Sequence, residues 1–239
     1  MRRIDVNSLY RLATTMGFGQ RPYLDIAANE VAVGNIPDST YYNRLFPRGW
    51  TQGNVMNLGV GQGEGEVTLI QLARYMAAIA NGGTLVTPHL VRSMVDPETG
   101  AQAVPEMPDP VRLELNQTYL QLLREGMRRV VAEQSWWLDI PGVPAIGKTG
   151  SAQNTRGDED DSVFIMSAPA ENPEIAIAVF VENAGFGSGA AGRIGSFMVE
   201  RYLTGRVDLS GDRGWIWTQM FNLNSEILPD RNEVRGPAG

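Results

Sequence analysis

The sequence predicts an α+β fold. Several segments in both halves of the chain carry apolar residues at the spacing of an amphipathic helix. Three strand-like segments follow one another later in the chain, at about 143–152, 162–168 and 174–182. Their connections are shorter than the roughly dozen residues that a parallel crossover needs, so we expect neighbouring strands to run antiparallel.

The first half is predicted to be mainly helical. Residues 4–16 have one apolar face and form the first expected helix. Residues 20–57 contain several prolines and glycines, and we expect them to be irregular. Thr68 followed by Gln71 is a capping-box sequence, which predicts a helix that continues to about residue 80.

The segments after residue 80 are predicted to be strands, loops and helices in turn. Residues 84–95 are expected to form a strand, and the proline-rich residues 101–110 a loop. Asn116 is a candidate N-cap for a helix over 117–133, and a final helix is predicted over 189–203. In the strand expected at 174–182, every residue between Glu174 and Glu182 is apolar, and such a run is typical of a strand covered on both faces.

Composition excludes several classes of function. The chain has 239 residues, is 43% hydrophobic and 20% charged, and therefore has enough apolar material for a core. Its net charge of -7 argues against a nucleic-acid-binding protein with a broad basic surface. The sequence has no cysteine and one histidine, which excludes thiol catalysis, disulfides and His-rich metal sites. No segment approaches the ~18 consecutive apolar residues of a membrane span.

One short segment concentrates the candidate chemistry. Lys148 is the only lysine of the chain, and it lies in Gly147-Lys-Thr-Gly-Ser151. Together with Gly142 the segment matches the nucleotide-binding P-loop pattern, but the residues after Thr149 are poor helix formers, and a P-loop needs a helix there. A surface turn that happens to contain these residues is a further alternative.

The other interpretation is the Lys-Thr-Gly element of serine acyl-transferases that react with β-lactams. In that element Lys148 supplies positive charge beside a nucleophile, and the Thr149 hydroxyl binds a substrate carboxylate. Gly150 lets substrate approach the strand, and the amide of Ser151 is one donor of an oxyanion hole.

The surrounding sequence resembles the transpeptidase domain of class B penicillin-binding proteins, of the elongation or cell-shape type. The resemblance covers about residues 4–204. Its segments occur in the family's order, and they are Trp50-Thr-Gln-Gly53, Asn57-Leu-Gly-Val-Gly-Gln-Gly63, Thr68-Leu-Ile-Gln-Leu-Ala73, Ala77-Ala-Ile-Ala-Asn-Gly-Gly83, Pro88-His-Leu-Val91, Gly126-Met-Arg-Arg-Val-Val131 and Gly147-Lys-Thr-Gly-Ser-Ala-Gln153.

The resemblance implies a β-lactamase/transpeptidase-like fold, with helices packed against an antiparallel sheet. It also implies peptidoglycan D,D-transpeptidation with no cofactor or metal. The partners implied are stem peptides, β-lactams and the cell-elongation machinery, without nucleic acid. The parent protein would be held in the bacterial cytoplasmic membrane with this domain on the outer side.

Two of the family's three motifs are missing. The sequence contains neither Ser-x-x-Lys, which carries the nucleophile, nor Ser-x-Asn. We therefore expect a C-terminal fragment that holds the last three of five strands, over residues 1–204, followed by a tail at 205–239 with a possible short helix around Trp215–Phe221. Such a fragment should be inactive alone, and a non-catalytic interaction module is an alternative.

Overall fold

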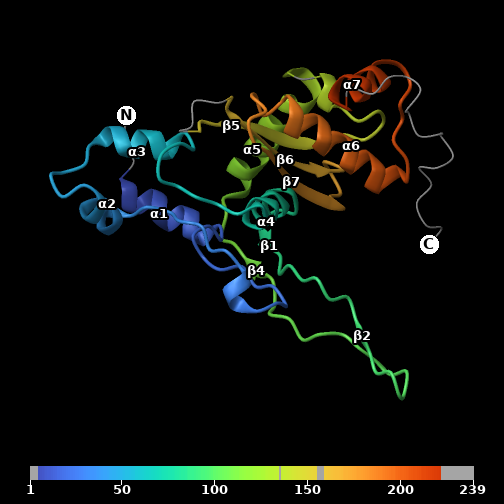
Figure 1. Ribbon diagram of the computed structural model, residues 1–239, viewed down its shortest axis with the longest axis horizontal. Coiled ribbons are helices and arrows are strands. Elements are labelled where there is room, and N and C mark those ends of the chain that lie inside the picture. The colour runs from blue at the N-terminus through green and yellow to red at the C-terminus, as the bar shows by residue number, and fades with distance from the viewer. Residues whose placement is uncertain (1–4, 135, 155–158, 222–239) are drawn as a thin grey trace. The chain divides into compact units, whose positions relative to one another are not determined.

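The computed structural model describes residues 5–134, 136–154 and 159–221. The chain divides into two compact units, Met1–Leu115 and Asn116–Gly239, called unit 1 and unit 2 below. Figure 1 shows their elements. Within the described ranges, no helix is both long enough and apolar enough to cross a membrane.

Unit 1 begins with three helices that share a small core. They are α1 (Val6–Thr15), α2 (Ser39–Leu45) and α3 (Gln52–Gly59). Val6, Tyr42 and Val55, one from each helix, are buried together. The Tyr42 hydroxyl donates to Glu64 Oε2 at 2.9 Å, and burial together with this carboxylate raises the pKa of Tyr42.

The expectation that residues 20–57 are irregular is wrong in its second half. Helices α2 and α3 begin there because their N-cap side chains accept hydrogen bonds from the first turn. Asp38 accepts from the amide of Tyr41 at 2.7 Å, and Thr51 forms a capping box with Asn54. The prolines that suggested irregular structure, Pro37 and Pro47, lie just outside α2.

The predicted capping box at residue 68 is confirmed. Thr68 and Gln71 exchange hydrogen bonds at the start of α4 (Leu69–Ala80). Gln71 is almost fully buried, and its amide nitrogen also donates to the carbonyls of Gln20 and Val33 at 2.8 and 2.7 Å. This side chain therefore joins the helix to two segments of the irregular region before α2.

The strand expected over residues 84–95 is only partly present. The structure has β1 (Thr84–Leu85), paired with β4 (Val111–Arg112), and β2 (Met94–Val95), paired with β3 (Gln102–Ala103). Pro88 cannot donate to a ladder, and the amides of Leu90 and Val91 bond to Asp25 instead of to a strand. The ladder is therefore interrupted between β1 and β2.

Unit 2 holds the predicted three-stranded antiparallel sheet. Its strands are β5 (Ile146–Ala152), β6 (Asp161–Ala168) and β7 (Ile175–Val181), in the order β5-β6-β7. Helix α6 (Ala190–Thr204) packs on β6 and β7, and α5 (Gln117–Arg129) packs on β5. Asn116 caps α5 as predicted, and a π-helical turn (Val130–Gln134) continues it.

The core of unit 2 lies between the sheet and α6. Phe164, Met166 and Val179 of the central and outer strands are buried there with Val199 of α6. The chain then forms α7 (Gly211–Phe221), close to the short helix expected around residues 215–221. An antiparallel sheet covered by helices is the α+β arrangement that the sequence predicted.

Candidate active site

The Gly147–Ser151 segment lies in the middle of β5. All seven residues of the strand pair with β6, from Ile146 opposite Ser167 to Ala152 opposite Asp161. Among the described residues β5 pairs with β6 alone, so its other side is an open edge. Half of the backbone amides and carbonyls of an edge strand point away from its partner. A substrate with an extended backbone could pair with those groups.

Strand alternation places consecutive site residues on opposite faces of the sheet. Lys148 and Gly150 lie opposite Ile165 and Val163 of β6, on the face away from α6. The Lys148 side chain is exposed, and its ammonium donates to the carbonyl oxygen of Thr149. The positive charge is therefore held beside the open edge of β5 and remains accessible.

Thr149 and Ser151 share the α6 face with Phe164 and Ser162, their partners on β6. Both are half-buried. The Ser151 hydroxyl accepts a hydrogen bond from the amide of Gly187 at 3.3 Å. Because this hydroxyl is engaged on the face opposite Lys148, it is poorly placed to be a nucleophile activated by that ammonium.

The P-loop interpretation does not fit this geometry. A P-loop needs a helix that opens at its lysine, so that backbone amides at the helix N-terminus can surround phosphate groups. Here Lys148 and Thr149 are the third and fourth residues of a strand that continues to Ala152. The match of Gly142–Thr149 to the nucleotide-binding pattern is therefore a coincidence of sequence.

A glycine-rich loop supports the site strand from the α6 side. This loop, residues 182–189, joins β7 to α6. A Cβ atom on Gly187 would lie 2.1 Å from the carbonyl oxygen of Gly150 and 2.4 Å from that of Val163. Backbone therefore packs directly on backbone behind Gly150, and only glycine permits such a close approach.

Three side chains fix this loop in place. The buried Ser162 hydroxyl donates to the carbonyl of Phe186 at 2.9 Å and accepts from the amide of Ala191 at 3.1 Å. The indole nitrogen of Trp137 donates to the carbonyl of Ser188 at 2.6 Å. Asp161 accepts from the amide of Asn183 at 2.9 Å. These contacts come from β6 and from the short helix η3 (Trp136–Leu138), so they hold both ends of the loop.

Sequence reasoning did not find this support. The run Gly185-Phe-Gly-Ser-Gly189 was available as a signal, because glycine repeated in a short connection often marks a close backbone approach. Ser162 gave no sequence signal, since a buried serine looks like any strand serine before its partners are known.

A surface cavity of about 280 Å3 lies near the start of the same strand. None of the four predicted site residues lines it; its lining is Gln121, Arg124, Glu125, Arg128, Ile146, Ala170 and Glu171. In the part of the chain that the structure describes, no three His, Cys, Asp or Glu side chains are grouped to hold a metal ion. The expectation that the protein uses no cofactor stays a prediction.

Comparison with known proteins identifies the family. Residues 2–199 match the model of the penicillin binding protein transpeptidase domain. A curated relative, the peptidoglycan D,D-transpeptidase MrdA of Haemophilus influenzae, is 27% identical over 214 residues, which are 80% of this chain and 32% of that protein. The chain thus spans about a third of the length of this relative.

Solved structures agree with this result. A complex between penicillin-binding protein PBP2 and MreC from Helicobacter pylori has a TM-score of 0.69 and 25% identity, over 84% of this chain and 36% of that one. The ceftriaxone acyl-enzyme complex of penicillin-binding protein A from Mycobacterium tuberculosis has a TM-score of 0.68 and 27% identity, over 82% and 43%. With its Lys-Thr-Gly strand in place and most of its length matched, the chain belongs to the penicillin-binding-protein transpeptidase family.

Proposed function

We propose that this chain is the part of a peptidoglycan D,D-transpeptidase that supplies the Lys-Thr-Gly strand. The observation that carries the proposal is the position of Lys148, exposed in the middle of a strand that pairs on one side alone within the described residues. The family match over residues 2–199 supports the same activity.

The proposed reaction is a two-step acyl transfer. A serine hydroxyl attacks the carbonyl of the penultimate D-Ala of a stem peptide, and the terminal D-Ala leaves as the amine. An amine of a second stem peptide then attacks the acyl-enzyme, which forms the cross-link and returns the serine. A β-lactam would acylate the same serine as a substrate mimic.

The residues of β5 have distinct roles in this proposal. Lys148 places positive charge near the reacting groups, and the Thr149 hydroxyl binds the substrate carboxylate. Gly150 leaves room for the substrate backbone, and the Ser151 amide donates to the oxyanion of the tetrahedral intermediate. The supporting loop behind Gly150 keeps these backbone groups in position before substrate arrives.

Partners and location are further parts of the proposal. A PBP2 in complex with MreC supports an assembly with the elongation machinery, and a ceftriaxone acyl-enzyme supports β-lactams as ligands. We propose that the complete protein is held in the bacterial cytoplasmic membrane and that this domain acts on the outer side.

The 239-residue chain by itself should not form a covalent penicillin adduct. Its sequence has no Ser-x-x-Lys, and Ser151 is engaged with the loop behind β5. Intact-mass spectra after treatment with benzylpenicillin should therefore show the unmodified mass. A stoichiometric acyl adduct would contradict this expectation and would identify an unrecognised nucleophile.

The proposed transpeptidase activity is tested on the complete protein, isolated from the cell that produces it. Labelled penicillin should acylate that protein if it is a transpeptidase, and the upstream coding sequence should contain an in-frame Ser-x-x-Lys. A non-catalytic interaction module would remain unlabelled and would lack the upstream motif. ATP titration of the same sample should show no binding, since β5 offers no helix N-terminus to phosphate.

A further inference from the structure

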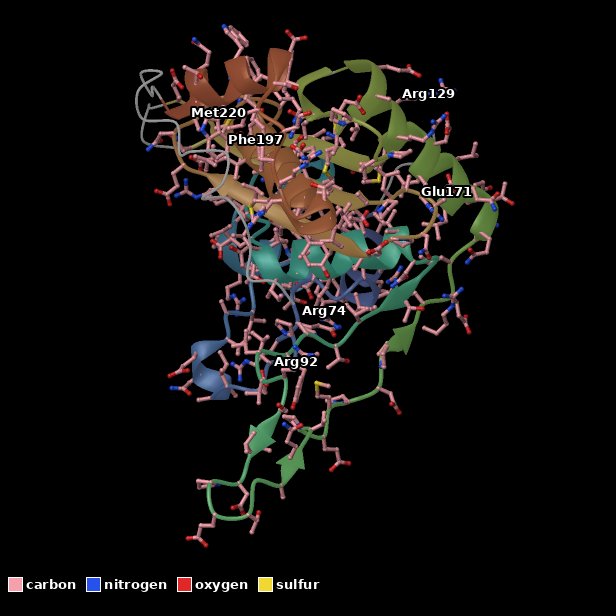
Figure 2. All side chains as sticks on the ribbon, turned by 90° about the vertical axis from the view of Figure 1, so that its right-hand side faces the viewer. Arg74, Arg92, Arg129, Glu171, Phe197 and Met220 are labelled. Atoms are coloured by element: carbon pink, nitrogen blue, oxygen red, sulfur yellow. The ribbon has the colours of Figure 1, made fainter. Side chains whose placement is uncertain are left out.

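A long hairpin, here called the arm (residues 86–112), extends away from the helices of unit 1 (Figures 1 and 2). Its two chains pair at only two positions, Met94 with Ala103 and Val95 with Gln102. Figure 2 labels Arg92 on the outgoing chain. An isolated two-stranded hairpin is marginally stable at best in water, so this ladder alone does not explain a defined arm.

The root of the arm is held on both of its chains. The two carboxylate oxygens of Asp25 accept hydrogen bonds from the amides of Leu90 and Val91, each at 2.7 Å. These bonds lower the pKa of Asp25, so the anchoring group remains ionised. On the returning chain, the Tyr23 hydroxyl donates to the carbonyl of Glu106 at 3.4 Å. One loop of unit 1 therefore fixes where the arm starts.

The tip of the arm is also ordered. Asp96 accepts from the amides of Glu98 and Thr99 at 2.8 and 2.9 Å. Its own amide donates to the carbonyl of Ala101 at 2.9 Å, and Gly100 provides the left-handed backbone that the turn requires. Hydrogen bonds at the root and at the tip thus define the arm despite its short ladder.

Three aliphatic side chains of the arm are largely exposed. Met94, Val95 and Val104 are 53%, 57% and 71% exposed. Met94 and Val95 are consecutive residues of one strand, so apolar surface is presented on both faces of the hairpin. Exposed aliphatic side chains gathered on one extended hairpin are typical of a site of interaction with another molecule.

The negative charge of the arm indicates the kind of partner. The arm as a whole, residues 86–112, contains four carboxylates and two arginines; the carboxylates are Asp96, Glu98, Glu106 and Asp109, and the arginines, Arg92 and Arg112, lie on the root side of the Met94–Gln102 ladder. An anionic lipid surface would repel such a segment, and so would the same segment of a second copy. A surface that combines apolar contact with positive charge complements it.

We propose that the arm is a docking element that inserts into an apolar cleft of another protein, flanked by lysine and arginine side chains. The apolar residues near the tip supply contact area, and the surrounding carboxylates orient the approach. Because both root and tip are ordered before binding, little conformational entropy is lost when the partner engages. The proposal does not depend on the transpeptidase activity.

Photo-crosslinking in the cell that makes the protein tests the position of the partner. Benzoylphenylalanine is placed at Val95 or at Val104, and, as the matched control, at Val60, which is 76% exposed in the same unit but outside the arm. We expect both arm positions to give one and the same adduct with a protein of different sequence. The Val60 position should not give this adduct.

Charge reversal tests the chemistry of the partner, once mass spectrometry has identified it and it has been purified. The variant Glu98→Lys/Glu106→Lys leaves the Asp96 turn intact and should weaken binding about tenfold or more, with affinity that falls as salt rises. The control variant, Glu30→Lys/Glu174→Lys, changes the net charge equally outside the arm and should bind like the unmodified protein.

Several results would overturn the proposal. One is the absence of an adduct specific to the arm positions. Another is an adduct that forms only within the chain, with a second copy of it or with lipid. The third is an equal loss of affinity in the two charge-reversed variants. Thermal unfolding of each variant verifies that the chain remains folded, so that a loss of binding can be assigned to the arm.

Discussion

A single methyl group at residue 187 would collide with the site strand. We predict that Gly187→Ala lowers the free energy of unfolding by at least about 1–3 kcal/mol, because the new Cβ overlaps the carbonyl oxygens of Gly150 and Val163. The matched control is Gly126→Ala, at an exposed position of α5 where a Cβ meets nothing within 4 Å. That substitution should stabilise the protein by about 0.5–1 kcal/mol through helix propensity.

Urea denaturation of the two variants beside the unmodified chain measures both changes. Equal stability of Gly187→Ala and the unmodified chain would mean that the loop can move off β5 without cost. In that case it would not be a fixed support for the site.

The charge of Lys148 should matter for acylation in the complete protein. We predict that Lys148→Ala lowers the acylation rate constant about a hundredfold, because a positioned charge acts on the developing transition state. Lys148→Arg should also be slow, since a planar guanidinium is larger and differently hydrated than an ammonium. Stopped-flow acylation by a chromogenic β-lactam measures both, and parental rates in both variants would contradict the assigned role.

At the level of elements, a buried ion pair links helix α7 to helix α6 within unit 2. The Arg213 guanidinium lies 2.5 Å from Glu200 of α6 and also donates to Ser196 and to the carbonyl of Asp139, at 3.0 and 2.9 Å. Both charged side chains are almost fully buried. Asp139 precedes the turn into β5, so Arg213 joins α7, α6 and the approach to the site strand.

We predict that Arg213→Met destabilises the chain by about 3–5 kcal/mol, because Glu200 is left as an unpaired buried charge. The double variant Arg213→Met/Glu200→Gln should lose less, since it removes that charge and retains an acceptor for the amide of Asp208. Arg128→Met is the surface control: its ion pair with Glu125 is about half exposed, and its loss should cost no more than about 0.5 kcal/mol.

Elements with local signals were predictable, and elements that depend on distant partners were not. The capping box of α4, the N-cap of α5 and the three strands of the sheet follow from neighbouring residues, and the structure has them. Helices α2 and α3 carry caps of the same kind at Asp38 and Thr51, but the surrounding prolines and glycines are equally typical of irregular structure.

For the candidate site, the motif places Lys148, Thr149, Gly150 and Ser151 together, and the structure has all four in β5. Their roles in the reaction stay predictions. The support behind these residues depends on contacts between residues far apart in sequence, such as Trp137 with Ser188. No local pattern reports such a contact. The division of the chain at residue 204 stays a prediction.

For the whole molecule, the outer edge of β7 determines whether the polypeptide is expected to self-associate. Among the described residues this strand pairs with β6 alone, and it is apolar throughout, without a proline. Phe180 is 40% exposed on it. Natural proteins usually protect such an edge with charge, proline or a covering segment, because unpaired backbone groups beside apolar side chains promote strand-to-strand association.

We therefore predict that the 239-residue polypeptide, expressed by itself, self-associates through β7. Size-exclusion chromatography with light scattering should give a mass above that of the monomer, and thermal unfolding should be broad. Phe180→Lys should shift the population toward monomer, because a cation on an edge strand opposes pairing with a second copy. Gln121→Lys adds the same charge on exposed α5 and should leave the association unchanged. A monodisperse monomer with a sharp transition in the unmodified polypeptide would show instead that the edge of β7 is covered.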